Sequence, residues 1–339
     1  MIVSFYDNNF KGLQNNASLV IDDNSYSLVK RPIEMDELTC TCEAFTENIQ
    51  PTFLIVKDKK GNYVYGCLAG IPELNEENKT EIHGTDTKSM LSSKVILQYD
   101  TTLTTVNEIL NYIFNEWATQ VNQNSFNVKL IFKDYIEEIP LTDLVPDAEK
   151  KVYNAWEELQ SYLNFYNLYL DTFIDITNKE VQFIVGKTMY RQLNIKLWEY
   201  GIKNYGKWIA DVNECQGYYI DENGNWTAGY KWILTSQNQL TITESKRDIY
   251  PIKREVVTSE ESLTNANTEA LKILLDSRFN ENIEIATTSI KPDFETRFEV
   301  YVKRGEEKYK DLPCGELHYD ASGLIKVQIG YRFTGIQFI

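Results

Sequence analysis

Short apolar runs separated by turn residues dominate both ends of this 339-residue chain, and they constrain its fold most strongly. Residues 53–57 and 63–71 are two such runs, and the turn-forming sequence between them predicts a β-hairpin. Near the other end, Phe298, Val300 and Val302 alternate with polar or charged neighbours. A period of two is typical of half-buried strands, so the chain is expected to be rich in β-structure.

The first hundred residues contain further strand patterns, at Ser27–Val29, Leu38–Phe45, Thr80–His83 and Val95–Tyr99. Gly84 is expected to end the third strand, and Asp86 to cap a single helical turn that reaches Leu91. Many short strands at close spacing indicate a small barrel or sandwich. The sequence therefore predicts a β-barrel-like domain over residues 1–100.

The apolar period changes after residue 100, where an amphipathic helix is expected to follow a cap at Thr104 or Thr105. A second helix is expected to open at Pro146 and Asp147. Its apolar face consists of Val152, Trp156, Leu159 and Leu163. Strands are predicted at Asn127–Phe132, Tyr166–Leu170, Phe173–Ile176 and Val181–Val185. This combination predicts an α/β insertion domain over residues 101–190.

The chain becomes β-rich again from residue 191. Residues 221–225 have the composition of a hairpin turn between two strands. One clear helix follows, with an apolar face made by Leu263, Ala266, Ala270, Leu271, Leu274 and Leu275. Strands are expected at residues 283–285 and 324–333. We expect a second β-rich domain over residues 191–260 and a C-terminal α/β segment over residues 261–339.

The charge of the chain excludes some classes of partner. Fifty acidic residues against 34 basic ones give a formal charge of −16, which provides no general attraction for nucleic acid or anionic lipid. The basic pairs Lys246-Arg247, Lys253-Arg254 and Lys303-Arg304 are isolated. Sequence-specific nucleic-acid binding is therefore not expected. No apolar stretch reaches the length that a membrane-spanning helix needs.

The cysteines and the N-terminus favour folding in a reducing compartment. Five cysteines at irregular spacing do not form a disulfide framework. Cys40 and Cys42 lie two apart on a predicted strand and point to one face. A tetrahedral zinc site would need two further ligands, and the chain has only His83 and His318 as histidines. The first ten residues lack the pattern of a secretory signal, so synthesis and folding in a reducing cytoplasm are expected.

Several motifs suggest chemistry but lack a required part. Gly186-Lys187-Thr188 follows an apolar strand as in a phosphate-binding loop, yet Val181 stands where that loop needs its first glycine. A nucleophilic pair of Cys314 with His318 would need a chance tertiary approach, and we interpret these two as a loop cysteine and a strand histidine.

The acidic motifs are interpreted in the same way. Glu137-Glu138, Glu157-Glu158 and Glu306-Glu307 are adjacent carboxylates, which point apart on a strand or helix and are expected to be solvated. Asp221, Asn223 and Asn225 resemble the start of a calcium loop, but Trp232 occupies its twelfth position. We therefore assign no catalytic, cofactor-binding or metal-binding residue, expect no cofactor, and expect no enzyme activity.

The order of the motifs resembles that of a known family, the tail hub (baseplate hub) proteins of bacteriophages and prophages. Residues 53–58 and 61–66 resemble one stretch of that family, and Ile82-His83-Gly84-Thr85-Asp86 with residues 90–96 resembles the next. Lys94 stands where the family often has arginine. Residues 230–234 and 240–243, followed by Arg247 and residues 250–252, are similar to its second β region. Ala266, Ala270, Leu274 and Leu275 are similar to the helix after it. The resemblance covers about residues 25–290.

The resemblance implies a protein that is made in the cytoplasm of a bacterial host and forms a homotrimeric ring in the virion, at the tip of a siphophage tail. Barrel-like domains would form the ring and α/β domains would lie at its periphery. Such a hub joins the distal tail protein, lies beneath the tape measure protein and lets DNA pass. Similar domains form the amino-terminal part of tail-associated lysozymes, whose hydrolase is not carried over to this chain, and the family supplies no catalytic residues to transfer.

Two other functions remain open at this stage. Trp156, Trp198, Trp208, Trp226 and Trp232 would suit a carbohydrate- or receptor-binding module. A cell-wall hydrolase would need a raised carboxyl pKa inside a cleft.

Overall fold

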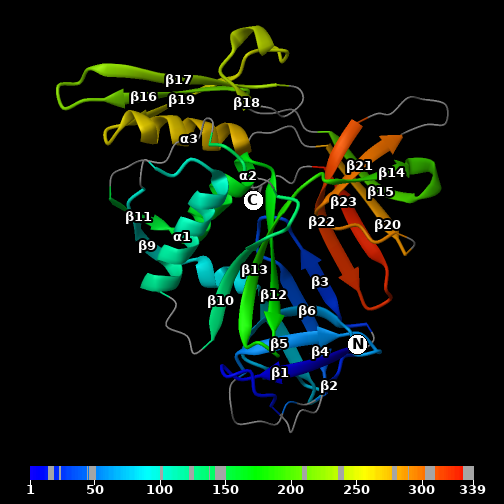
Figure 1. Ribbon diagram of the computed structural model, residues 1–339. Helices are drawn as coiled ribbons and strands as arrows, with labels where there is room; N and C mark the ends of the chain where they lie inside the picture. Colours follow the sequence, from blue (N-terminus) through cyan, green and yellow to red (C-terminus); the bar gives the residue numbers. More distant parts are fainter. Residues whose placement is uncertain are drawn as a thin grey trace.

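A computed structural model describes residues 1–13, 19–22, 24–43, 45, 51–99, 102–121, 126–136, 138–141, 150–207, 212–235, 240–276, 281–288, 290–301 and 310–330. Within these residues the chain forms two barrel-like units and two smaller modules (Figure 1). The expected fold class is confirmed: the protein is α+β, β-rich and multidomain, and small barrel-like units carry α/β insertions.

The first barrel is built from the N-terminal strands. They are β1 (Ile2–Tyr6), β2 (Leu19–Val20), β3 (Ser27–Lys30), β4 (Glu37–Cys42), β5 (Phe53–Lys57), β6 (Tyr63–Ala69), β7 (Glu73–Leu74) and β8 (Thr80–Thr85). They pair in the order β3-β4-β8-β6-β5-β1-β2, and a bridge from Ile21 to Cys42 returns the chain to β4. Apolar side chains fill the interior, and the thiols of Cys40, Cys42 and Cys67 are free and buried there. Gly84 does not end β8 as expected, because its backbone still pairs with Leu38 and Ala69.

The second barrel combines strands from both sides of residue 260. They are β14 (Arg191–Lys196), β15 (Gly201–Lys207), β20 (Glu281–Thr287), β21 (Thr296–Tyr301), β22 (Lys310–Asp320) and β23 (Ile325–Ile329). A short 3-10 helix, η3 (Leu197–Glu199), leads from β14 to β15. The paired strands surround one apolar core, in which Phe298, Val300 and Val327 are fully buried. The boundaries of the four expected domains remain a prediction, since these pairings do not define them.

A continuous ladder joins the two barrels. Strand β22 pairs antiparallel with β3, from Leu317 opposite Lys30 to Asp320 opposite Ser27. His318 lies in β22 and is a strand residue, as expected, but Cys314 in the same strand is expected in a loop. The structure corrects this: Cys314 is a buried strand residue, and a register shift lies between it and Glu316.

The α/β module is inserted between the barrels. It contains β9 (Lys94–Leu97), α1 (Val106–Gln120), β10 (Asn127–Phe132), β11 (Lys151–Asn154), α2 (Ala155–Phe165), β12 (Leu168–Asp175) and β13 (Glu180–Lys187). Strands β10, β13 and β12 form one sheet, and β9 pairs with β11 in another. The expected cap of α1 is confirmed, because the Thr105 side chain accepts a hydrogen bond from the backbone of Glu108.

The expected second helix starts later than predicted. Residues 146 and 147 lie outside the described residues, and Val152 belongs to strand β11, where 63% of its surface is exposed. Helix α2 begins at Ala155 because the Asn154 side chain caps the backbone N–H groups of Trp156 and Glu157.

The last module is inserted within the second barrel. Strands β16 (Glu214–Ile220), β17 (Trp226–Leu234), β18 (Leu240–Thr241) and β19 (Arg254–Ser259) form a sheet, and α3 (Leu263–Asp276) covers one face. Gly217 lets the helix approach closely, because a β-carbon at that position would overlap the backbone of Ala266. The 3-10 helix η4 (Glu244–Lys246) follows β18. In Figure 1, α3 lies between this sheet and the rest of the molecule.

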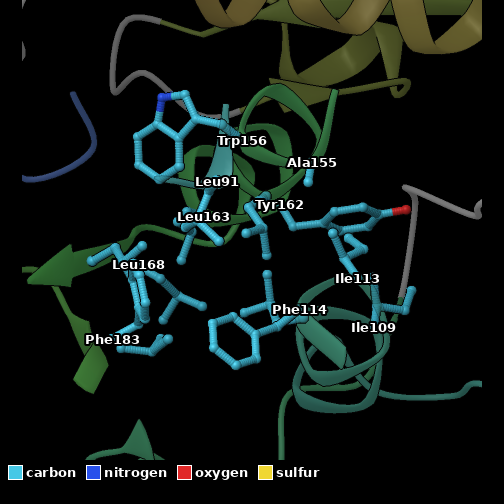
Figure 2. Close-up of a cluster of buried hydrophobic side chains, with 14 of the residues drawn as sticks. Leu91, Ile109, Ile113, Phe114, Ala155, Trp156, Tyr162, Leu163, Leu168 and Phe183 are labelled. Atoms are coloured by element: carbon cyan, nitrogen blue, oxygen red, sulfur yellow. The ribbon is translucent and has the colours of Figure 1, made fainter. Parts of the chain in front are cut away.

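One large apolar core joins the two modules. Figure 2 shows Ile113 and Phe114 of α1 packing with Tyr162 and Leu163 of α2, and Phe183 lies beside Phe114. Ala270, Leu271 and Leu274 of α3 belong to the same cluster. No helix among the described residues is both long and apolar enough to cross a membrane.

Candidate functional site at the seam between the barrels

We call the ladder between β3 and β22 the seam. A buried charged cluster lies beside it, and the centre of the cluster is a short 3-10 helix, η2 (Thr87–Leu91). Asp86 caps this helix as expected, since its Oδ1 accepts the backbone N–H of Lys88 at 2.9 Å. The other oxygen of Asp86 accepts the backbone N–H of Asp36 at 2.8 Å. We call Lys30, Arg31, Asp36, Asp86, Lys88 and Asp171 the junction network.

Lys88 connects two acidic side chains that are inaccessible to solvent. Its ammonium lies 3.0 Å from Asp86 Oδ2 and 3.2 Å from Asp36 Oδ1, and its side chain is only 1% exposed. The ammonium also donates to the carbonyl oxygens of Arg31 at 3.2 Å and Glu34 at 2.6 Å. Each proton of the buried ammonium therefore has an acceptor, which is what a buried lysine requires.

The pKa values within the network follow from burial and from the neighbouring charges. Burial raises the pKa of Asp36 to about 6, although the charge of Lys88 acts in the opposite direction. Burial alone would lower the pKa of Lys88, but the carboxylates of Asp36 and Asp86 outweigh it and raise that pKa above its ordinary value. Lys88 is therefore charged at neutral pH.

The remaining members tie three parts of the chain together. Lys30 of β3 donates to both carboxylate oxygens of Asp171 in β12, at 2.9 and 3.0 Å. The guanidinium of Arg31 contacts Glu37 of β4 at 2.7 Å and Glu316 of β22 at 3.1 Å. The junction network thus connects the first barrel with the α/β module and with the second barrel.

A second buried carboxylate repeats this arrangement nearby. Glu295, which precedes β21, is fully buried and accepts hydrogen bonds from Tyr135 at 2.6 Å and Tyr169 at 3.0 Å. Lys133 forms an ion pair with it, and the Nε of Arg191 lies 3.0 Å from its Oε2. Burial would raise the pKa of Glu295, but these donors keep it below its ordinary value. Glu295 therefore fixes the α/β module against the second barrel.

A groove between the two modules has a different character. Its volume is about 680 Å³, and it lies between α2 and β11 on one side and α3 and β19 on the other. Three lysines and three glutamates line it together with hydroxyl and amide side chains: Lys150, Lys151, Lys272, Glu158, Glu261 and Glu269.

The groove corrects one expectation for the adjacent carboxylates. Glu157 is exposed, but Glu158 is half-buried and accepts a hydrogen bond from the Tyr99 hydroxyl at 2.8 Å. Burial raises the pKa of Glu158 above its ordinary value, although Tyr99 and the charge of Lys272 lower it. Glu138 is exposed, whereas Glu137, Glu306 and Glu307 lie outside the described residues.

The phosphate-loop resemblance has a packing explanation. Gly186 and Lys187 are the last residues of β13, and a β-carbon at Gly186 would overlap the ring of Tyr169. The hydroxyl of Thr188 donates to the carbonyl oxygen of Asn167 at 2.8 Å. The glycine therefore makes room for an aromatic ring.

The histidine and the calcium-like turn also have structural partners. His318 Nε2 lies 2.9 Å from the hydroxyl of Ser27 across the seam. The predicted hairpin turn is confirmed, since Asp221 accepts the backbone N–H groups of Asn223 and Asn225, both at 2.8 Å. No group of three or more potential metal-binding side chains lies together among the residues described by the structure.

The isolated basic pairs contribute to an ion-pair cluster on the four-stranded sheet. Arg247 and Arg254 both form ion pairs with the buried carboxylate of Glu214, and Arg247 also contacts Glu244 at 2.7 Å. Lys303 and Arg304 lie outside the described residues. The guanidinium groups of Arg247 and Arg254 are thus each paired with carboxylates of the same sheet.

Of the residues in the junction network, only Asp86 could be singled out from the sequence. Lys88 and Asp36 look like ordinary surface charges, and their partners are up to 57 residues away along the chain. The one local signal was the cap at Asp86, which placed Lys88 in the helical turn.

Comparison with known proteins places the fold among phage tail proteins. No family model matches the chain, and no curated protein matches it. The prophage tail protein gp18 from Listeria monocytogenes EGD-e has a similar structure, with a TM-score of 0.54 and 13% identity over 99% of this chain and 96% of that chain. The tail protein from Neisseria meningitidis MC58 has a TM-score of 0.52 and 12% identity over 97% of this chain and 96% of that chain. The expected resemblance is confirmed at the level of the fold.

Proposed function

We propose that this chain is a structural hub protein that forms a homotrimeric ring at the tip of a phage or prophage tail. The observation that carries the proposal is the pair of barrels held in one sheet by β3 and β22. The Arg31–Glu316 ion pair also joins the first barrel to the second beside this ladder, so each copy would contribute two barrels as one rigid block. A ring of such blocks would cover strand edges that otherwise promote aggregation.

The proposal includes the partners that a tail-tip ring meets. The ring would join the distal tail protein and lie beneath the tape measure protein, and its inserted modules would point outward. A net charge of −16 would keep DNA from adhering while it passes through the lumen. A lumen lined mostly by basic side chains in the assembled ring would contradict this part.

We propose that the chain catalyses no covalent reaction. The most deeply buried carboxylates, Asp86 and Glu295, contact lysine ammonium groups and lie at seams between parts of the fold. Such charges support packing rather than a substrate.

The proposal can be tested on tails purified from the producing cells. Mass spectrometry should detect the chain in the particle, and chemical cross-linking should trap dimers and trimers of it. Recovery of particles that lack the chain, or cross-links that never join two copies, would contradict the proposal. A monomer in dilute solution would not, because hub proteins can assemble only on the particle.

One specific observation, the exposure of Trp226, favours a carbohydrate- or receptor-binding role. Trp156 and Trp232 are buried and Trp198 is half-buried, while Trp208 lies outside the described residues. Trp226 is 59% exposed and contacts Tyr218 with ring centroids 5.8 Å apart. A glycan array that shows binding by the chain and loss of binding in Trp226→Ala would support this alternative. A cell-wall hydrolase would instead clear wall suspensions and lose that activity in Glu158→Gln.

A further inference from the structure

Helix α1 protects one edge of the two-stranded sheet formed by β9 and β11. The side chain of Gln120 accepts the backbone N–H of Ile96 at 2.9 Å and donates to its carbonyl oxygen at 2.8 Å. The Tyr112 hydroxyl makes the same two contacts with Gln98, at 2.9 and 2.8 Å. These side chains replace a neighbouring strand, so nothing further can pair with β9 on that side.

The opposite edge of this sheet pairs with no other strand among the residues that the structure describes, and the register shows which backbone groups lie there. In an antiparallel pair, directly opposed residues turn their backbone groups either toward each other or away from each other. Ile96 lies opposite Val152 and turns its backbone toward α1. The N–H and C=O of Val152 therefore point away from β9, at a residue that lines the groove.

A second open edge lies across the same groove. Strand β19 pairs only with β16 within the described chain, and the carbonyl oxygen of Lys253 accepts the backbone N–H of Glu214 at 3.2 Å. Alternation along a parallel pair then turns the backbone of Thr258 away from β16. Thr258 and Ser259 also line the groove.

The side chains of the groove complement a polypeptide rather than an apolar ligand. The lining charges balance, with three lysines and three glutamates, and the hydroxyl and amide groups of Ser161, Thr264 and Asn265 lie among them. Open strand edges supply alternating backbone donors and acceptors, which an extended peptide matches along its whole length.

We infer that the groove receives an extended segment of a neighbouring tail protein, which adds to β11 as a third strand and carries both basic and acidic side chains. The inference rests on the proposed function, since that role places the inserted modules beside other tail proteins. A third strand would also stabilise the sheet, because two-stranded sheets are marginal alone. The exposed side chain of Val152 would then pack beside a side chain of the new strand on the same face of the sheet.

Hydrogen exchange on whole tails tests the inference. Amide exchange in the peptide that covers residues 150–154 should be about tenfold slower in assembled tails than in the free chain. Equal exchange in tails that contain the chain would overturn the inference and leave the proposed function intact. Tails that lack the chain would overturn both.

Two variants at one position separate backbone pairing from side-chain contact. Val152→Pro removes an N–H that points away from β9 and leaves the hydrogen bonds of the β9–β11 ladder in place, and proline is compatible with an edge strand, so the free variant should unfold at the wild-type urea concentration. It should enter tails about fivefold less well, the factor for one lost hydrogen bond, whereas Val152→Thr should enter them normally. Equal incorporation of both variants would overturn the inference, as would protection of residues 150–154 in the concentrated pure chain, which would assign the groove to a second copy.

Discussion

The junction network and the groove both bring lysines together with carboxylates, but they differ in burial. In the junction network, the side chains of Lys88, Asp36 and Asp86 are at most 1% exposed. In the groove, Lys272 and Glu269 pair at 3.0 Å while their side chains are 41% and 55% exposed. Water screens the second pair and leaves it available to exchange partners.

The difference in burial separates charges that stabilise the fold from charges that can bind a partner. Removing one partner of a buried ion pair leaves the other charge buried without compensation, which strongly lowers the free energy of unfolding. A buried pair therefore fixes the parts of the fold that carry it. An exposed pair contributes little to folding and can be rearranged by a ligand. The seam is therefore the rigid part of this molecule, and the groove is its adaptable part.

Replacing one lysine in each region should give the largest difference in the free energy of unfolding between the two regions. Lys88→Met leaves Asp36 and Asp86 buried without their cation and should lower the free energy of unfolding by about 3–5 kcal/mol. Lys272→Met, the matched control in the groove, should change it by less than about 0.5 kcal/mol. Urea unfolding measures both, and equal losses would contradict the distinction.

The pH dependence of unfolding should reveal Asp36. The folded protein raises this pKa from 3.8 to about 6, so it holds the proton more tightly than the unfolded chain. The contribution of Asp36 to the free energy of unfolding should therefore increase as the pH falls through this interval, by about 2–3 kcal/mol.

Unfolding of wild type and Asp36→Asn at several pH values isolates this contribution, since other titrating groups are common to both proteins. The wild type should gain stability relative to the variant on acidification from pH 7 to pH 4. Parallel curves would show that Asp36 titrates as an ordinary carboxyl.

Glu295→Gln should have an intermediate effect at the second barrel. The amide can still accept from Tyr135 and Tyr169, but it loses the charge that pairs with Lys133. We expect a loss of about 1–3 kcal/mol in the free energy of unfolding. Glu269→Gln in the groove is the control, and a loss there as large as that at Glu295 would remove the contrast.

The smallest expected effect concerns the protected edge of β9. Gln120→Leu removes both hydrogen bonds to Ile96 and should cost about 1 kcal/mol. Its more informative readout is association: light scattering should show self-association of the variant through the uncovered edge. A variant that remains as dispersed as the wild type would show that α1 does not guard this edge.

Elements whose signals are local could be predicted from the sequence. The hairpin of β5 and β6 follows from the turn residues at 58–62, and α1 follows from its cap at Thr105 and its apolar period. The hairpin at Asp221 follows in the same way. In each case the residues that decide the structure lie within a few positions of one another.

Elements that depend on distant partners were missed. The first half of β22 was missed although His318 was expected in a strand, because Pro313 and Gly315 weaken the pattern there and pairing with β3, β21 and β23 forms the strand. Val152 fits a helical period but lies in β11, because its partner Ile96 is far along the chain. The junction network was missed for the same reason, since tertiary packing alone buries Lys88.

We propose that each copy of this chain contributes two fused barrels to a ring at the tail tip. Single-particle imaging of purified tails, with a small tag inserted in the exposed turn at residues 221–225, tests it most directly. A homotrimeric hub should appear as a threefold ring at the tip with three tags on its periphery. A tip without threefold order, or tags that lie along the tail tube, would contradict it.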